Sequence, residues 1–173
     1  MYQLRVALLD QNSERLGSAS EFVKVPDLST GHLALSSILL RKGRAAFSGV
    51  DHPEGQAAGD DSAIAAATRV FRPGDELSYE YLVFNAKSSA QHKPSLEVET
   101  RLFRDGKQVY AGQPMVPGVT GDAASGRLLA GGHMTLTQAV PPGEYVLQIV
   151  VTDKLAREKY QIASEWTDFE LQR

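Results

Sequence analysis

Apolar and polar residues alternate with a period of two along most of the chain, which predicts β-strands and little helix. The clearest run covers residues 77–85, and its apolar positions on one face are Leu77, Tyr79, Tyr81 and Val83. A second run covers residues 96–103, and the Asp-Gly pair behind it is typical of a tight hairpin turn. Further strands are expected at residues 34–40, 108–111 and 134–140, for a total of about nine or ten.

The first residues of the chain repeat the last ones. Residues 2–10 (YQLRVALLD) align with residues 145–153 (YVLQIVVTD), and residues 19–22 (ASEF) align with residues 163–166 (ASEW). Each copy has the plan of a β-hairpin: an alternating strand, a polar turn and a second strand. We therefore interpret the chain as a piece of a longer protein that starts inside the closing hairpin of one module and contains the next module.

Short strands separated by frequent turns predict an all-β fold. We expect an antiparallel β-sandwich of immunoglobulin-like or fibronectin-III-like type in residues 31–173, preceded by an orphan β-hairpin in residues 1–30. A hairpin alone is marginal in water. We expect it to dock on the sandwich as an added pair of edge strands, and the alternatives are pairing with a second copy or fraying.

Tyr145 is a candidate structural residue because it follows the turn sequence Pro141-Pro-Gly-Glu. This arrangement is typical of a tyrosine corner, in which the tyrosine hydroxyl bonds to the backbone a few residues upstream. The alternative is an ordinary exposed tyrosine. Tyr2 occupies the equivalent position in the first hairpin, and it is expected to play the equivalent part.

Trp166 is the only tryptophan, and Phe22 is its counterpart in the repeat. A single tryptophan in a strand is expected in the core. The alternative is an exposed Trp166 that forms a sugar-stacking platform with tyrosines at positions 79, 81 or 110. Because Tyr79 and Tyr81 alternate in phase with the apolar residues of their strand, we expect them to be buried.

Two long stretches, residues 43–67 and 112–126, are rich in Gly, Ala, Pro and Asp. Loops of this length are either functional or mobile. Because they lack anchoring aromatic residues, we expect mobile loops, and functional loops are the alternative. Single helical turns are expected at residues 61–67 and 153–158.

Composition excludes several classes of function. The 173 residues carry a net charge of -3 and no cysteine, which excludes disulfides, cysteine nucleophiles and cysteine-ligated zinc. Lys and Arg are spread along the chain, so we expect no nucleic-acid partner. No apolar run approaches the ~20 residues of a membrane helix, and no leader pattern opens the chain, so we expect no membrane insertion.

The sequence contains no convincing metal-binding motif. The four histidines, His32, His52, His92 and His133, lack the spacing of a metal-binding pair and are expected to be solvated loop residues. The carboxylates of the first long loop, at positions 51, 54, 60 and 61, could serve calcium, but they lack the regular spacing of a calcium loop. We expect a solvated loop, with no metal and no cofactor.

An enzyme is not expected. No Gly-x-Ser-x-Gly elbow positions a nucleophile. Glu97 and Glu99 share one face of a strand, but we expect that face to be the solvent side. A hydrolase would be reconsidered only if a cleft held converging Asp and His side chains.

The segments 17–28 (GSASEFVKVPDL), 33–40 (LALSSILL), 71–77 (FRPGDEL) and 141–171 together resemble the C-terminal, all-β region of bacterial proteins related to von Willebrand factor type A, abundant in acidobacteria. The resemblance covers most of the chain outside the two loops. In such proteins the β region follows a secretion signal and a type A domain. The metal-binding Asp-x-Ser-x-Ser motif of that domain is not in this sequence.

The resemblance implies an extracytoplasmic protein engaged in adhesion or assembly. We therefore expect a non-catalytic interaction or spacer module that contacts a protein partner or the neighbouring domains of its parent chain. Exposed strand edges could also form a homodimer. The alternative function is a carbohydrate-binding β-sandwich module.

Overall fold

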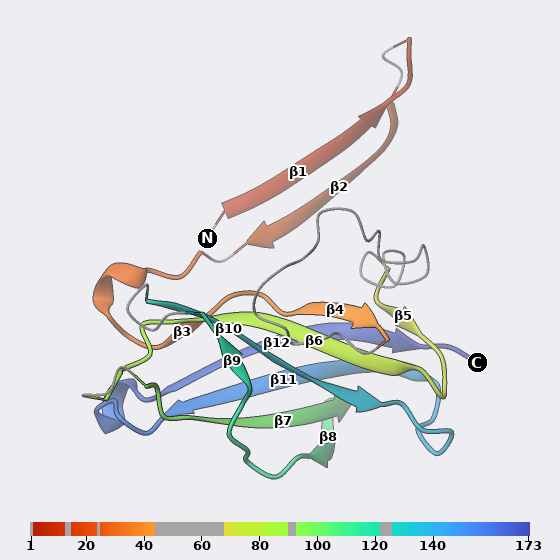
Figure 1. The fold of residues 1–173 in the computed structure, drawn as a ribbon. Helices are drawn as coiled ribbons and strands as arrows, with labels where there is room; N and C mark the ends of the chain where they lie inside the picture. Colours follow the sequence, from red (N-terminus) through yellow and green to blue (C-terminus); the bar gives the residue numbers. More distant parts are fainter. Residues whose placement is uncertain (1, 13–14, 24, 44–67, 90–92, 122–125) are drawn as a thin grey trace. The chain divides into compact units, whose positions relative to one another are not determined.

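The computed structural model describes residues 2–12, 15–23, 25–43, 68–89, 93–121 and 126–173 (Figure 1). The chain divides into two units, residues 1–30 and 31–173. Strands make up most of the regular structure in the described residues, which confirms the expectation of a predominantly β protein. The described 3₁₀-helices are the short η1 (Leu28–Thr30) and η3 (Glu158–Tyr160).

The first unit contains a β-hairpin formed by β1 (Tyr2–Leu9) and β2 (Arg15–Val23). The two strands are antiparallel along their length, with a register shift between Leu8 and Leu9. The predicted N-terminal hairpin is therefore confirmed. The expectation that it docks on the second unit stays a prediction.

The second unit contains two five-stranded sheets. The first has the order β3-β6-β10-β9, with β4 also pairing with β6. Its strands are β3 (Ala34–Leu35), β4 (Leu39–Lys42), β6 (Glu76–Phe84), β9 (Val119–Thr120) and β10 (Arg127–Thr135). All of its pairings are antiparallel.

The second sheet has the order β5-β12-β11-β7-β8. Its strands are β5 (Val70–Phe71), β7 (Leu96–Arg104), β8 (Lys107–Ala111), β11 (Gly143–Asp153) and β12 (Ile162–Leu171). The short β5 is parallel to β12, so the expectation of purely antiparallel sheets is wrong at this edge. Gln172 N donates to the Phe71 carbonyl at 2.8 Å, which fixes this parallel pair.

Several sequence predictions are confirmed in this unit. The alternating runs at 77–85 and 96–103 correspond to β6 and β7. The Asp-Gly turn joins β7 to β8, and Asp105 and Gly106 have φ values of 50° and 71°. Two consecutive positive φ values are those of a type I′ turn, whose twist matches that of the flanking strands.

The strand predicted at residues 134–140 is wrong, because β10 spans Arg127–Thr135 and a turn follows it. In the structure Gly132 lies opposite Tyr79 on β6. A Cβ atom at Gly132 would collide with the Tyr79 ring and hydroxyl, so the glycine makes room for a large aromatic side chain.

Other predicted boundaries are also corrected. The expected strand at 34–40 is interrupted, and it forms the short β3 and β4. The expected loop at 112–126 contains β9. The described residues contain twelve strands in place of nine or ten, because two-residue strands escape a periodicity that needs several positions. The helical turn expected at 61–67 lies outside the described residues, and that expected at 153–158 is replaced by η3.

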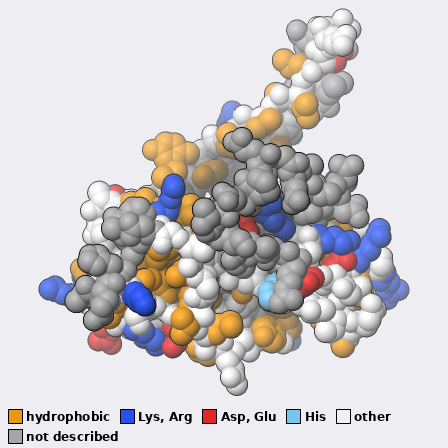
Figure 2. Space-filling model, in the orientation of Figure 1, with side chains coloured by type: hydrophobic (Ala, Val, Ile, Leu, Met, Phe, Trp, Pro, Cys, Tyr) orange, Lys and Arg blue, Asp and Glu red, His pale blue; other side chains and the backbone are white. Residues whose placement is uncertain are grey.

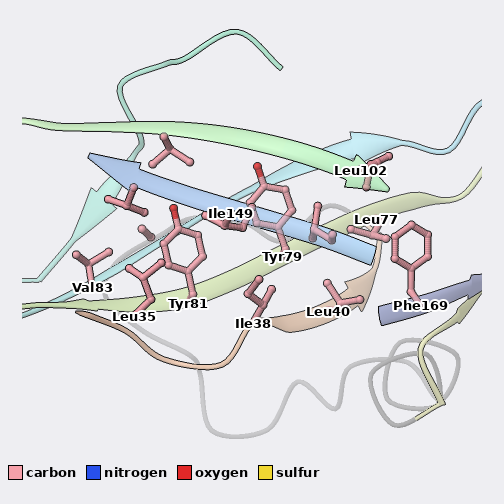
Figure 3. Close-up of a cluster of buried hydrophobic side chains, with 14 of the residues drawn as sticks. Leu35, Ile38, Leu40, Leu77, Tyr79, Tyr81, Val83, Leu102, Ile149 and Phe169 are labelled. Carbon is pink, nitrogen blue, oxygen red and sulfur yellow. The ribbon is translucent and has the colours of Figure 1, made fainter. Parts of the chain in front are cut away.

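The two sheets of the second unit share one hydrophobic core (Figure 3). The alternating face of β6 supplies Leu77, Tyr79, Tyr81 and Val83, as predicted. The facing sheet supplies core residues from β7, β11 and β12, which include Leu102, Leu147, Ile149 and Phe169. One polar contact crosses this core: the Tyr79 hydroxyl and Thr100 Oγ1 are 2.9 Å apart.

The two repeated hairpins have the same local design. Asn12 N donates to Asp10 Oδ1 at 2.8 Å, and Leu155 N donates to Asp153 Oδ1 at 2.9 Å, so an Asx turn follows the first strand in both. Their registers differ by two residues, since Ala19 pairs with Val6 whereas its counterpart Ala163 pairs with Val151, the counterpart of Leu8. A two-residue shift leaves every side chain on its original face.

Candidate functional site

Tyr145 lies at the start of β11 and makes the contact that defines a tyrosine corner. Its hydroxyl donates to the Pro141 carbonyl at 2.6 Å. The ring is 2% exposed and stacks on Phe169 with centroids 5.5 Å apart. Arg104 lies on β7, and its guanidinium is 5.7 Å from the centroid of the Tyr145 ring. Tyr145 therefore ties the β10–β11 connection to the second sheet.

Tyr2 and Phe22 occupy the equivalent positions of the first hairpin. Tyr2 is 68% exposed and pairs with Val23. The backbone of Phe22 pairs with Gln3, and its side chain lies outside the described residues. A structural role for these two residues stays a prediction.

The expectation that Trp166 is a core residue is wrong, because its side chain is 64% exposed. On β12, Thr167, Phe169 and Leu171 point into the core. Side chains alternate between the two faces of a strand, so Trp166 points outward. Its opposite phase to Phe169 and Leu171 was the sequence signal for this orientation.

The predicted tyrosine partners of Trp166 do not share its face. Tyr79 and Tyr81 are 6% and 2% exposed, which confirms their expected burial, and burial raises the pKa of both phenols. Tyr110 is half-exposed, but it pairs with the buried Leu102 on the inner face of the sheet. Trp166 instead pairs with Gln148, whose other neighbour across the sheet is Arg101.

Charged side chains on this outer face pair with one another. Arg101 donates two hydrogen bonds of 2.8 Å to the Glu99 carboxylate. These bonds lower the pKa of Glu99 below its ordinary value. Lys154 binds Glu97 at 2.9 Å, so both glutamates lie on the predicted face within ion pairs.

The histidines divide into two described and two undescribed residues. His32 stacks on Tyr160 with centroids 4.1 Å apart. His133 lies in β10, 3.8 Å from Glu76, so the expectation of a turn position is wrong for it. His52 and His92 lie outside the described residues, as do the carboxylates at positions 51, 54, 60 and 61.

Among the described residues, no group of three or more His, Cys, Asp or Glu side chains could hold a metal ion. In the same part of the chain, no helix is long and apolar enough to cross a membrane.

Among the clefts lined by described residues of the second unit, two are large enough to hold a ligand. One, of about 640 Å³, lies at the end of the outer face of the second sheet. It is lined by four carboxylates, at positions 105, 144, 168 and 170, and Arg69 forms an ion pair of 2.6 Å with Asp168 there.

The other cleft, of about 660 Å³, lies between the two sheets. Its walls come from β7 and β8 on one side and from the end of β10 with the following turn on the other. This cleft was not predicted from the sequence, because the strand there was expected at residues 134–140 and β10 ends at Thr135.

No protein-family model matches the chain. No significant match is found among the curated proteins.

Proposed function

We propose that residues 31–173 form an immunoglobulin-like module of a larger extracytoplasmic bacterial protein, and that the module acts as a non-catalytic spacer and interaction domain in adhesion or assembly. The extracytoplasmic and adhesive parts of this proposal rest on the resemblance to proteins related to von Willebrand factor type A. The modular part rests on the architecture.

Strand order supports the immunoglobulin-like assignment. Such domains place strands A, B, E and D in one sheet and C, F and G in the other. Taking β3 and β4 as A, β6 as B, β10 as E and β9 as D accounts for the first sheet. Taking β7 as C, β11 as F and β12 as G accounts for the second, with β8 as an added C′ and β5 as an added edge strand beside G.

The tyrosine corner supports the same assignment. In immunoglobulin-like domains this tyrosine lies near the start of strand F. Tyr145 lies near the start of β11, the proposed F strand, and bonds to Pro141 four residues upstream.

The observation that carries the modular proposal is the second copy of the closing hairpin. The β1–β2 hairpin repeats the Asx turn of β11–β12 and the apolar face that β11 buries in its core. The simplest origin of such a hairpin is a second module of the same kind.

The ends of the second unit support a spacer role. Near the start of the unit, Ala34 pairs with Phe84, the last residue of β6. Near the end of the unit, Leu171 pairs with Phe71, which lies shortly before the first residue of β6 (Figure 1). A module whose chain begins and ends at opposite ends of its sheets holds the domains before and after it apart by the length of those sheets.

Small-angle scattering of a chain with residues 31–173 duplicated in tandem tests the spacer role. We expect the maximum dimension to exceed that of the single chain by about 35 Å, the length of an eleven-residue strand. An unchanged maximum dimension would contradict it. Antibodies against the module should also label intact cells of the source bacterium that produce the complete parent protein, and labelling only after lysis would contradict the proposed location.

Carbohydrate binding remains the second candidate, because Trp166 presents a 64% exposed indole on a sheet face. Aromatic rings of this kind can stack on sugars. Quenching or a shift of Trp166 fluorescence on titration with oligosaccharides, lost in Trp166→Ala, would favour this function over the spacer. An emission spectrum that no oligosaccharide changes would remove it.

A further inference from the structure

The edge of the first sheet is only partly covered beside β10. All nine residues of β10 pair with β6. On the other side, only Leu129 and Ala130 pair within the described residues, with the two-residue β9. Among the described residues, the stretch from Gly131 to Thr135 therefore has no partner strand on this side, where alternate residues direct their backbone N–H and C=O groups away from β6.

The 660 Å³ cleft runs beside this edge and provides room for side chains. Its apolar lining combines buried Leu102 and Leu136 with the half-exposed Val109 and Tyr110 and the partly buried Met134. Figure 1 shows β8 beside the end of β10, so the cleft lies between two strand edges. An extended segment added to β10 would direct alternate side chains into this apolar space.

Arg104 supplies a positive charge to the cleft lining, and His133 supplies an imidazole ring. Arg104 lies over the Tyr145 ring and 3.6 Å from Asp105, whose side chain is 87% exposed. His133 is 3.8 Å from Glu76. Such long, solvated pairs are weak, so the Arg104 guanidinium can bind a further carboxylate.

We propose that this edge and cleft bind an extended segment of a partner protein, which adds as a strand beside β10. The segment has apolar side chains at alternate positions and carboxylates at one end. Main-chain hydrogen bonds to residues 131–135 supply affinity, and the apolar cleft and the Arg104 guanidinium supply selectivity. This proposal names the partner chemistry of the interaction module and rests on that proposed function.

Three acetylated and amidated peptides test the proposal on the full chain. The first is Asp-Glu-Val-Thr-Val-Thr-Val, the second replaces both acids by Lys, and the third replaces the second of the three Val residues by Pro. We expect the first to shift the amide resonances of residues 131–135 and the ring resonances of Tyr110. The second should bind at least about 10-fold more weakly because its charge is reversed. The third should not bind, because proline removes a main-chain donor and its ring disrupts the added strand.

Variants locate the site. Tyr110→Ala and Met134→Ala should each weaken binding of the first peptide about 10-fold, as expected for apolar contacts at the centre of an interface. Ile162→Ala is the matched control, because Ile162 is 61% exposed on the other face of the second sheet. Unchanged amide spectra away from the cleft verify that each variant is folded.

Three results would overturn the proposal. They are equal affinity for the acidic and lysine peptides, retained binding of the proline peptide, and absence of binding by the first peptide. Shifts of residues 131–135 that follow protein concentration without peptide would assign the edge to a second copy instead. Because the tandem scattering experiment does not involve this edge, the spacer role can stand while the partner site fails.

Discussion

The β1–β2 and β11–β12 hairpins share a sequence pattern and an Asx turn, but they differ in what covers their apolar face. Tyr145, Leu147, Ile149 and Val151 are at most 2% exposed. Their counterparts Tyr2, Leu4, Val6 and Leu8 are 54–68% exposed. The comparison separates local from tertiary causes: alternation and turn chemistry suffice for a hairpin, whereas burial needs a second layer. Figure 2 shows hydrophobic side chains on the surface of the first hairpin.

The largest difference between the hairpins is expected for a matched pair of leucine substitutions. Leu147→Ala should lower the free energy of unfolding by about 3–4 kcal/mol, because it leaves a cavity in the core. Leu4→Ala should change it by less than about 0.5 kcal/mol, since the Leu4 side chain already contacts water. Urea unfolding followed by far-ultraviolet circular dichroism measures both. Equal losses would show that the first hairpin is also covered.

The Asx turns give the next test. Asp153 is fully buried and accepts hydrogen bonds from Lys87 N at 2.7 Å and Leu155 N at 2.9 Å. Asp153→Ala removes both of these part-buried hydrogen bonds to a charged acceptor, so we expect a loss of about 2–3 kcal/mol. Asp10→Ala should cost less than about 1 kcal/mol, because its turn is solvated. Urea unfolding followed by circular dichroism measures both losses of unfolding free energy. A larger loss for Asp10→Ala than for Asp153→Ala would contradict the comparison.

A smaller difference is expected for the two tyrosines. Tyr145→Phe removes the hydrogen bond to Pro141 and keeps the ring, which should cost about 1–1.5 kcal/mol. Tyr2→Phe should be nearly neutral, because the Tyr2 side chain is exposed and its hydroxyl is hydrated in both the folded and the unfolded state. Thermal unfolding provides the measurement. A neutral Tyr145→Phe would mean that the corner contributes nothing to stability.

The smallest effect is pH-dependent. The pKa of Glu99 is lowered in the folded state by the hydrogen bonds from Arg101, so its ion pair stabilises the fold above the ordinary pKa of 4.5. This contribution is lost as the pH falls through the lowered value. Glu99→Gln should therefore lower the melting temperature slightly at pH 7 and leave it unchanged at about pH 2. If the variant and the unmodified protein still differed in melting temperature at about pH 2, the effect would have a cause other than the Glu99 ion pair.

The sequence predicted the elements that are long and regular. Strands β6 and β7, the Asp-Gly turn and both terminal hairpins follow from alternation and turn chemistry, which act over a few residues. It did not predict β5 or β9, because each has only two residues and exists through its pairing partner. It also misplaced the end of β10, where Gly132 lies in the strand opposite Tyr79 and leaves room for its ring. The cleft beside β10 was missed for the same reason.

By itself, the sequence determined that the chain is built of strands, that its two ends are hairpins of one design, and which strand faces are apolar. Local backbone preferences and side-chain alternation are enough for these properties. Only the tertiary structure decided which strands are neighbours and which apolar faces are covered. Trp166 and Leu147 lie in paired strands, yet one is exposed and the other buried, because each points to a different side of the same sheet.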